Sequence, residues 1–489
     1  MTLTAAKRVI TGWAMYDWAN SVYNLVITTT FFPIYFTKAT FHHFKSDTVP
    51  FLGMHLKSTS LYSYALAAAY LVIALLYPAL TSIADTRGNK KSFMQFFCYM
   101  GAIGCSALFL FDGSNLGLGV FCFMLASMGY VGSLVFYNAY LPEIAAPEDQ
   151  DRVSAKGFAF GYIGSVLMQL IGFGLVLLIK DNPFFSLRLN FLLVGIWWAA
   201  FAQFTFAVLP KTPRQPAARK NVFKAGFTEV KKVYAEIKKM AVLKRYLRAF
   251  FFYSIGVQTF MSAATLFGSD VLKLDDTKLI VTIVLIQLVA IVGATWMSRL
   301  SQKFGNIRVL MGVIAFWVLL CISAYLTAGQ AEHLAPFHEK IAELQLQKDD
   351  LLAKKGQMTS TAFELADANV EGELSRWQHD LAPHQEPIEY SFYLLALGTG
   401  LVMGGIQSLS RSTYSKLMPE TKDTASYFSY YDLSEKIAIV VGMFTFGFVG
   451  QITGNLKNSI IFLIIFFIIG LIWLYSAQAR QQQESAPAI

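Results

Sequence analysis

A stripe of polar side chains lies inside the first long apolar stretch of the sequence. The segment YDWANSVYN, which begins at Tyr16, has mostly apolar residues on both sides. Each residue of a helix advances about 100°, so residues three or four apart share a face. One arc of about 80° therefore contains four polar residues of this segment and its continuation: Asp17, Asn20, Asn24 and Thr28.

These residue types limit the chemistry that the stripe can perform. An ionised carboxylate at the centre of a bilayer costs at least ~3 kcal/mol, so the stripe cannot face lipid. Amides and hydroxyls can hydrogen-bond a polar solute, and a buried Asp can take up and release a proton. The alternative is hydrogen bonding that only joins helices, worth about 0.6 kcal/mol per contact. Four aligned polar positions favour the lining of a water-filled cavity.

The composition indicates which elements carry this stripe. Of the 489 residues, 55% are hydrophobic and 15% are charged, whereas soluble domains carry about 25% charged residues. Apolar runs of about 20 residues are long enough to cross a bilayer. They predict an all-α membrane protein with twelve transmembrane helices: 10–37, 60–84, 93–111, 116–141, 155–180, 188–210, 246–269, 277–300, 307–328, 389–411, 425–452 and 457–478.

The predicted helices divide into two groups of six. Residues 1–210 would form an N-terminal six-helix bundle and residues 246–480 a C-terminal one. The basic linker 211–245 is predicted to form an amphipathic helix on the inner membrane face, and 481–489 a cytoplasmic tail. Within the second bundle, the acidic insertion 329–388 carries apolar residues three or four apart, which predicts a helical hairpin outside the membrane.

Basic residues indicate the orientation of the chain. Lys and Arg are concentrated on the side of the two termini, for example in residues 86–91 and in the linker. Such an excess is typical of cytoplasmic segments. We therefore expect cytoplasmic termini, a location in the cell membrane and contact with membrane lipid. The net charge of +9 is explained in this way and does not indicate a nucleic-acid partner.

The loop ADTRGNKK, residues 84–91, resembles the signature loop of the major facilitator superfamily. Gly88 permits a tight turn, and Asp85 can accept hydrogen bonds from the N-terminus of a neighbouring helix or pair with a cation. The resemblance implies the major facilitator fold, and we predict that Asp85 and Arg87 belong to a cytoplasmic gate. A loop that only sets topology is the alternative. Gln302 stands at the corresponding place in the second half, so the latch should be asymmetric.

Polar residues in other predicted helices extend the same cavity. The stripe and these residues together give a predicted substrate site: Asn20, Asn24, Tyr137, Asn138, Tyr253, Gln258 and Gln407. Three carboxylates are candidates for proton coupling: Asp17, Asp432 and Glu435. Further charged residues near the inner mouth are predicted to join the gate: Glu143, Arg411 and Lys436. Asp432 and Lys436 could equally form only a self-neutralising i,i+4 pair.

Longer motifs show a narrower resemblance. GWAMYDWANSVYNLVITTTFFPIYF, YNAYLPEIA, KGFAFGYIGS, GVQT and GGIQSLSRSTYSKLMPE resemble the vacuole effluxer family, a major facilitator branch named for fungal autophagy-related amino-acid exporters. The resemblance covers most of the membrane portion. It implies alternating access and, for the fungal members, efflux of amino acids. Ile255 stands where many relatives carry an Asp, and the 329–388 insertion is not expected of the family in general.

The sequence therefore predicts a monomeric secondary active transporter that moves a small polar solute, such as an amino acid, by proton-coupled alternating access. The alternative is a transporter-like sensor or binding protein that uses the external hairpin to engage a ligand or protein partner. No P-loop, G-x-S-x-G or H-E-x-x-H motif is present in the sequence, so neither an enzyme nor a cofactor is expected. The His spacings match no metal-ligand pattern, so no metal site is expected.

Overall fold

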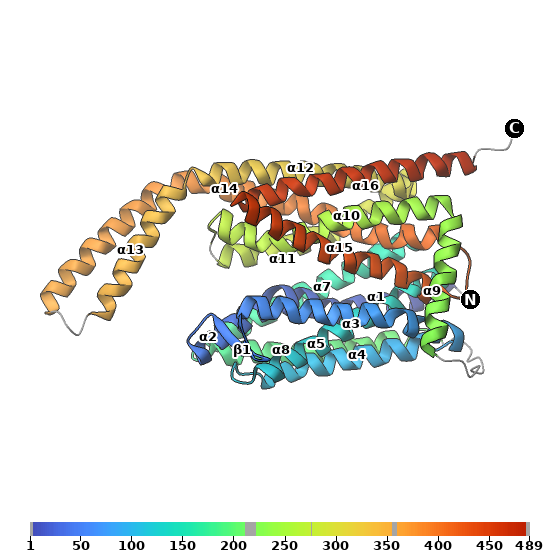
Figure 1. Cartoon of the computed structure of the whole chain (residues 1–489), viewed down its shortest axis with the longest axis horizontal. Coiled ribbons are helices and arrows are strands. Elements are labelled where there is room, and N and C mark those ends of the chain that lie inside the picture. Colours follow the sequence, from blue (N-terminus) through green and yellow to red (C-terminus); the bar gives the residue numbers. More distant parts are fainter. Residues whose placement is uncertain (1–2, 211–221, 275, 355–358, 486–489) are drawn as a thin grey trace.

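The computed structural model describes residues 3–210, 222–274, 276–354 and 359–485. Nearly all of these residues are helical, and ten of the described helices are long and apolar enough to cross a membrane. Figure 1 shows two groups of roughly parallel helices that lie side by side. The fold is the all-α membrane architecture that the sequence predicts. The first part of the predicted linker, 211–221, lies outside the described residues.

The N-terminal bundle contains the helices that precede residue 210. Their bounds, with two short strands, are α1 (Leu3–Val22), η1 (Tyr23–Phe31), α2 (Phe32–Phe44), β1 (Thr48–Phe51), β2 (Met54–Lys57), α3 (Ser58–Arg87), α4 (Lys90–Ala107), η2 (Leu108–Leu110), α5 (Leu116–Ala139), α6 (Leu141–Ile144), α7 (Gln150–Leu178) and α8 (Pro183–Val208). The strands pair antiparallel, with Thr48 opposite Lys57.

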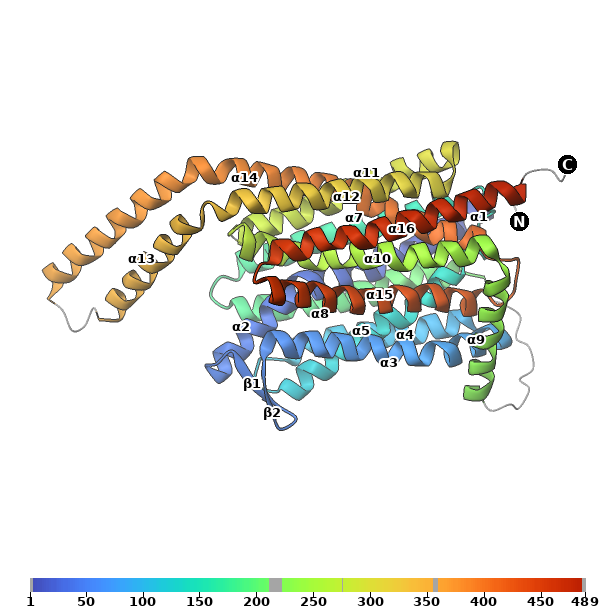
Figure 2. The same ribbon diagram turned by 45° about the horizontal axis from the view of Figure 1, so that its top comes forward.

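The C-terminal bundle follows α9 (Val222–Lys239). Its elements are α10 (Ala241–Leu266), η3 (Phe267–Val271), α11 (Asp276–Phe304), α12 (Asn306–Glu332), α13 (Ala335–Ala353), α14 (Ser360–Leu417), α15 (Thr424–Thr453) and α16 (Leu456–Ser485). Both chain ends and α9 lie at one end of the molecule, whereas α13 and the first part of α14 project from the other (Figures 1 and 2). We call these ends the terminal side and the projection side.

The projecting arm and a membrane helix are parts of one element. Helix α14 runs without interruption over 58 residues, although it contains Pro383 and Pro387. The sequence analysis separated an outer hairpin arm from a span that begins near residue 389. One continuous helix therefore connects the projection to the part of α14 that carries Gln407 and Arg411.

The first helix changes its winding within the polar stripe, because Asn24 and Thr28 lie in the π-helical segment. Helix α1 continues into η1, a π-helix of nine residues, in which the hydroxyls of Thr29 and Thr30 both donate to the Leu25 carbonyl. The first helix of the second half, α10, also continues into a π segment, η3. Such segments occur often at functional sites, and here they mark equivalent helices of the two halves.

Helix α9 packs two of its apolar residues on protein. Val233 and Ile237 are buried, whereas Tyr234 is exposed. The Tyr427 hydroxyl donates to the Glu236 carboxylate at 2.6 Å, and Lys232 lies 3.1 Å from Asp423. Helix α9 therefore holds the beginning of α15 while it crosses the terminal side (Figure 2).

Glycines allow close approach of α11 and α14. A Cβ added to Gly404 would lie 2.1 Å from the Ala290 carbonyl oxygen, and one added to Gly293 would lie 2.1 Å from the Leu401 carbonyl oxygen. The obstructing atoms are backbone, so no side-chain rotation can make room. The small residues fix the distance between the two helices.

We expect Gly404→Ala to lower the melting temperature of the purified protein, because the methyl group would force α11 and α14 apart. Overpacking of this kind costs about 1–3 kcal/mol. Gly312→Ala is the matched control, because an added Cβ there meets no atom within 4 Å and Ala favours helix by up to ~1 kcal/mol. Equal melting temperatures for the two variants would contradict the packing argument.

Candidate functional site

One buried arginine joins the two bundles. Arg411 lies on α14 of the C-terminal bundle and is 3% exposed. Its guanidinium is surrounded by residues of α1, α5 and α7, all from the N-terminal bundle. We call these residues the Arg411 socket: Trp13, Asp17, Tyr137, Asn138, Ser154 and Phe158.

The polar part of the Arg411 socket consists of acceptors. Arg411 Nε and Nη2 donate to Ser154 Oγ and the Ser154 carbonyl, both at 2.9 Å. Nη1 donates to Asn138 Oδ1 at 3.3 Å. Nη1 and Nη2 lie 3.4 and 3.5 Å from Asp17 Oδ2, and the Tyr137 hydroxyl donates to the same carboxylate oxygen at 2.7 Å. Asp17 is thus a buried carboxylate with both a cation and a phenol as partners.

Aromatic rings complete the Arg411 socket. The guanidinium carbon lies 4.3 Å from the ring centre of Phe158, 4.8 Å from Trp13 and 5.3 Å from Tyr137. Trp13 stacks on Tyr137 with ring centres 4.4 Å apart. A Cβ at Gly157 would approach Asp17 Oδ2 to 2.5 Å, so glycine at this position leaves room for the ion pair.

Asp432 is the buried carboxylate that lacks a cationic partner. It is 3% exposed, and its Oδ1 accepts a hydrogen bond of 3.3 Å from Asn138 Nδ2. Its Oδ2 has no partner. In the described part of the chain, neither Arg411 nor Lys436 forms an ion pair with it, because each pairs with another carboxylate. An unpaired buried charge is costly, so Asp432 is suited to carry a proton.

Two charged groups of α15 lie next to each other and remain partly accessible. Lys436 Nζ is 2.9 Å from Glu435 Oε2, and the two side chains are 11% and 22% exposed. Glu435 also accepts a 2.9 Å hydrogen bond from Gln258 of α10, and Lys436 Nζ lies 5.5 Å from the ring centre of Tyr70. Adjacent residues on a helix point in different directions. This pair can therefore offer a cation and an anion separately.

The first of two latches joins the bundles at the terminal side. Asp85, at the end of α3, accepts hydrogen bonds from the backbone N–H groups of Ala425 and Ser426 at 3.2 and 2.8 Å. These groups belong to the first turn of α15, where the helix dipole favours an anion. Lys90 lies 3.5 Å from Asp85 and binds Glu143 and Thr424. Lys90 thus takes the role expected of Arg87, which is exposed.

The second latch also centres on an acid of the N-terminal bundle, which lies on α7 rather than at the end of α3. The buried Asp151, in the first turn of α7, accepts hydrogen bonds from Ser301 Oγ, Asn306 Nδ2 and Lys416 Nζ at 2.7, 2.6 and 2.7 Å. All three donors belong to the C-terminal bundle. Gln302, at the place that corresponds to Asp85, is exposed. Both latches therefore take their acid from the N-terminal bundle, and both hold the same side closed.

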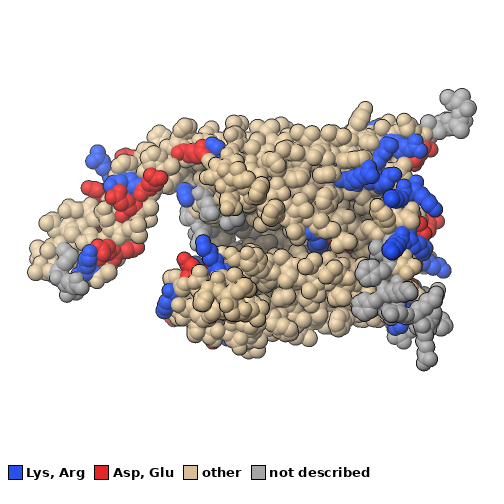
Figure 3. Space-filling model, viewed as in Figure 1, with Lys and Arg blue, Asp and Glu red and all other residues tan. Residues whose placement is uncertain are grey.

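The opposite side is open between the bundles. Figure 3 shows the molecule hollowed between its two halves on the projection side. Deeper in the interface, Tyr162 donates to Gln407 at 2.6 Å, and Gln287 of α11 donates to Gln169 of α7 at 2.9 Å. A hollow between two bundles that polar contacts join is the form of a carrier closed at one side.

The structure brings together many of the residues that the sequence analysis singled out. Asp17, Tyr137, Asn138, Arg411 and Asp432 form one cluster, and Gln258, Glu435 and Lys436 a second. Other predicted residues lie elsewhere. Asn20 is fully buried without a hydrogen-bond partner, and Asn24 is half-buried. The Tyr253 hydroxyl is 2.7 Å from Ser410 Oγ inside the C-terminal bundle.

Several residues of the site were missed by the sequence analysis. Lys90 lies in the quoted loop but was not given a role. Asp151 and Lys416 lie at helix ends in segments rich in charge, where the sequence alone does not distinguish a solvated residue from a latch. Ser154 and Phe158 could have been found only from their helical spacing to Gly157 and Gly161, which mark the face of α7 that approaches α1.

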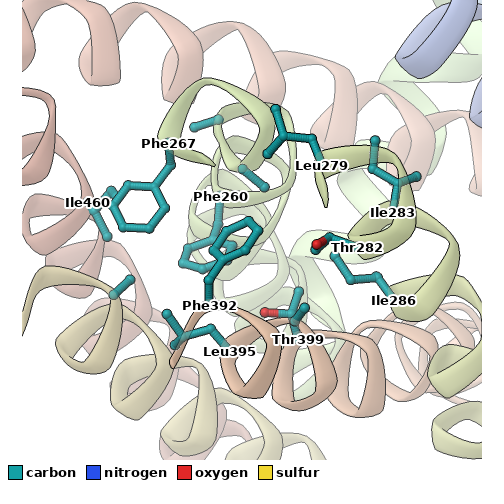
Figure 4. A pocket seen from close by; sticks show the side chains of 14 residues that line it. Phe260, Phe267, Leu279, Thr282, Ile283, Ile286, Phe392, Leu395, Thr399 and Ile460 are labelled. Carbon is teal, nitrogen blue, oxygen red and sulfur yellow. The ribbon is translucent and has the colours of Figure 1, made fainter. Parts of the chain in front are cut away.

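An apolar cavity lies within the C-terminal bundle (Figure 4). Its lining includes Phe260, Phe267, Leu279, Phe392 and Ile460. Among the lining residues that the structure describes, the polar side chains are those of Thr282 and Thr399. Its lining residues on α10 are on the face opposite Gln258, since residues 258 and 260 are about 200° apart on a helix. The cavity is therefore separate from the polar clusters.

We expect Asp151→Ala to lower the melting temperature strongly, because the substitution removes an acceptor that three donors share and takes away the carboxylate that pairs with the Lys416 ammonium. Breaking a buried ion pair costs about 3–5 kcal/mol. Asp149→Ala is the matched control, because Asp149 only forms an exposed pair with Arg152, worth about 0–1 kcal/mol. If the two variants have the same melting temperature, the second latch does not stabilise this state.

Comparison with known proteins places this geometry in a family. The model of the family described as "Vacuole effluxer Atg22 like" matches residues 5–342 and 377–486. The chain is 26% identical to the MFS-type transporter YxiO of Bacillus subtilis, over 97% of both chains. It is 24% identical to autophagy-related protein 22-1 of Phaeosphaeria nodorum, over 100% of this chain and 93% of the relative.

Solved structures share the fold. The human organic anion transporter MFSD10 (TETRAN) aligns with a TM-score of 0.65 at 12% identity, covering 97% of this chain and all of the other. The fucose:proton symporter FucP of E. coli aligns with a TM-score of 0.61 at 13% identity, covering 97% and 98%. The chain belongs to the vacuole effluxer Atg22-like family, and it is a secondary transporter of the major facilitator superfamily rather than an enzyme.

Proposed function

We propose that this transporter moves small zwitterionic solutes, with amino acids as the leading class, by proton-coupled alternating access. The observation that carries the proposal is the position of the polar contacts between the bundles. The Arg411 socket and both latches close the terminal side, while the molecule is hollowed on the projection side (Figure 3). The alternate state requires these contacts to break together and the hollow to close.

The Glu435–Lys436 pair supports the choice of a zwitterion. A carboxylate of the solute can bind the Lys436 ammonium, and an ammonium of the solute can bind the Glu435 carboxylate. Gln258 already engages Glu435 and can position it. Neither side chain is fully buried, so a solute that reaches the floor of the hollow can replace their mutual contact.

Asp432 supports proton coupling better than Asp17 does. The charge of Asp17 is balanced by Arg411 at 3.4 Å, whereas Asp432 has one oxygen without any partner. Asn138 links the two groups, because its Oδ1 accepts from Arg411 and its Nδ2 donates to Asp432. Protonation of Asp432 would alter the hydrogen bonds of Asn138. It would thereby change how strongly the Arg411 socket binds the guanidinium.

The same proposal includes the orientation and direction of transport. Lys and Arg gather at the terminal side (Figure 3), which favours a cytoplasmic position for the termini, α9 and the latches. The family description, vacuole effluxer, favours export. We place the protein in the cell membrane, in contact with membrane lipid. We infer a monomer, because residues of a single chain form the whole site. The exposed, acidic projection would be available to a protein partner.

We expect Asp432→Asn to abolish accumulation driven by a pH gradient while exchange of labelled for unlabelled solute continues near the native rate. The amide keeps the shape of the carboxylate but cannot release a proton. Asp17→Asn should instead impair both activities, since Arg411 would lose its counter-charge at a cost of about 3–5 kcal/mol. Both are measured in proteoliposomes. Gradient-driven accumulation by Asp432→Asn would remove this residue from the coupling role.

We expect the Glu435–Lys436 pair to determine which charges a solute needs. In counterflow competition, Lys436→Gln should bind an amino acid and its carboxamide derivative, which keeps the ammonium but lacks the carboxylate charge, about equally. The native protein should prefer the amino acid by about tenfold or more. A charged hydrogen bond is worth about 1.5–3 kcal/mol. Glu435→Gln should likewise stop distinguishing the amino acid from its N-acetyl derivative. Discrimination that persists in both variants would refute this assignment.

A further inference from the structure

Every N–H group of Arg411 has an acceptor in the N-terminal bundle. A guanidinium carries five N–H donors in a rigid plane. The five hydrogen bonds of Arg411 end on Ser154 Oγ, the Ser154 carbonyl, Asn138 Oδ1 and, twice, Asp17 Oδ2. One side chain of the C-terminal bundle is therefore bound by the other bundle as completely as a ligand is bound by a receptor.

The surroundings are complementary to a cation in general. The groups that meet the guanidinium are a carboxylate, an amide oxygen, a hydroxyl oxygen, a carbonyl oxygen and three aromatic faces. The negative faces of aromatic rings attract cations, by up to about 2 kcal/mol each where water is excluded. The donors of these residues are directed away from the guanidinium. The Tyr137 hydroxyl donates to Asp17, Asn138 Nδ2 to Asp432, and Ser154 Oγ to the Ser408 carbonyl.

The Arg411 socket must lose this cation during transport. Its acceptors are on α1, α5 and α7, and Arg411 is on α14, so separation of the bundles at the terminal side withdraws the guanidinium. Asp17 would then keep only Tyr137 as a partner in a partly desolvated position. A buried anion without a counter-charge is costly, and a free cation that arrives from the terminal side would relieve that cost.

We infer that the Arg411 socket is a binding site for small guanidinium compounds, and that Arg411 is its tethered competitor. The inference rests on the proposed alternating access, because the site becomes vacant only when the terminal side opens. A guanidinium compound that occupies it would hold the transporter open toward the terminal side and slow exchange. The site differs from the Glu435–Lys436 pair in both charge preference and position.

The first test uses Arg411→Ala, which vacates the site. Methylguanidinium at millimolar concentration should raise the melting temperature of this variant by about 2 °C or more. Methylurea, a planar neutral compound of similar shape, should not raise it. The double variant Asp17→Asn, Arg411→Ala should show no rise with either compound. Equal shifts with the two compounds, or a shift that persists in the double variant, would overturn the inference.

A second test keeps Arg411 and therefore does not depend on a variant in which the site is empty. Ser415 lies one helical turn from Arg411 toward the terminal side, is 4% exposed and has a hydroxyl without a partner. Ser415→Cys therefore removes no contact, and the four natural cysteines are all buried. Methylguanidinium should increase the rate at which a water-soluble maleimide labels this cysteine severalfold, whereas methylurea should not. Labelling that is unchanged by methylguanidinium would overturn the inference.

The two proposals can fail separately. Binding of methylguanidinium is measured at equilibrium in purified protein and requires no flux. A protein that binds methylguanidinium but exchanges no amino acid would retain the Arg411 socket and refute the proposed solute. If the protein exchanges amino acids but methylguanidinium changes neither the melting temperature nor the labelling rate, the proposed function stands and the cation site is refuted.

Discussion

A charge that is buried between two moving bundles must be neutralised in every state that the protein visits. Arg411 sets this constraint, because it belongs to the C-terminal bundle while Asp17 belongs to the other. In water such a pair would be worth little, but in a dry interface each charge depends on the other. Opening of the terminal side therefore breaks the interaction that closes it. Water, a proton or another ion must then stabilise the separated charges.

The rest of the fold can be understood as the support of that pair. Gly157 lets α7 approach Asp17, and the stacked rings of Trp13 and Tyr137 hold the carboxylate and guanidinium in place. The two latches lie between this pair and the terminal end, each with one Asp as its centre. Asp85 uses the first turn of α15, and Asp151 uses donors from three helices of the opposite bundle. Separate elements thus oppose the same opening motion.

Sequence reasoning found the first helix of the site because polar residues are rare in apolar runs. It could not tell which neighbour each residue faces. Asn20 and Asp17 share an arc of α1, yet Asp17 meets Arg411 while Asn20 is buried without a partner. A helical wheel gives directions relative to one axis, and the distinction between the bundle interior and the hollow depends on how neighbouring helices pack. The class of fold required only length and hydropathy, and so it was predicted correctly.

The inner region contains an imbalance of charge that connects coupling with solute choice. Three carboxylates, on Asp17, Asp432 and Glu435, accompany two cations, on Arg411 and Lys436. For this region to be neutral, one more positive charge is needed. A proton on Asp432 would supply it and occupies little volume. A solute ammonium at Glu435 would supply the same charge one helical turn away. In the proposed mechanism, proton and solute are therefore alternative sources of one positive charge for two neighbouring clusters, and their competition would couple their movements in opposite directions.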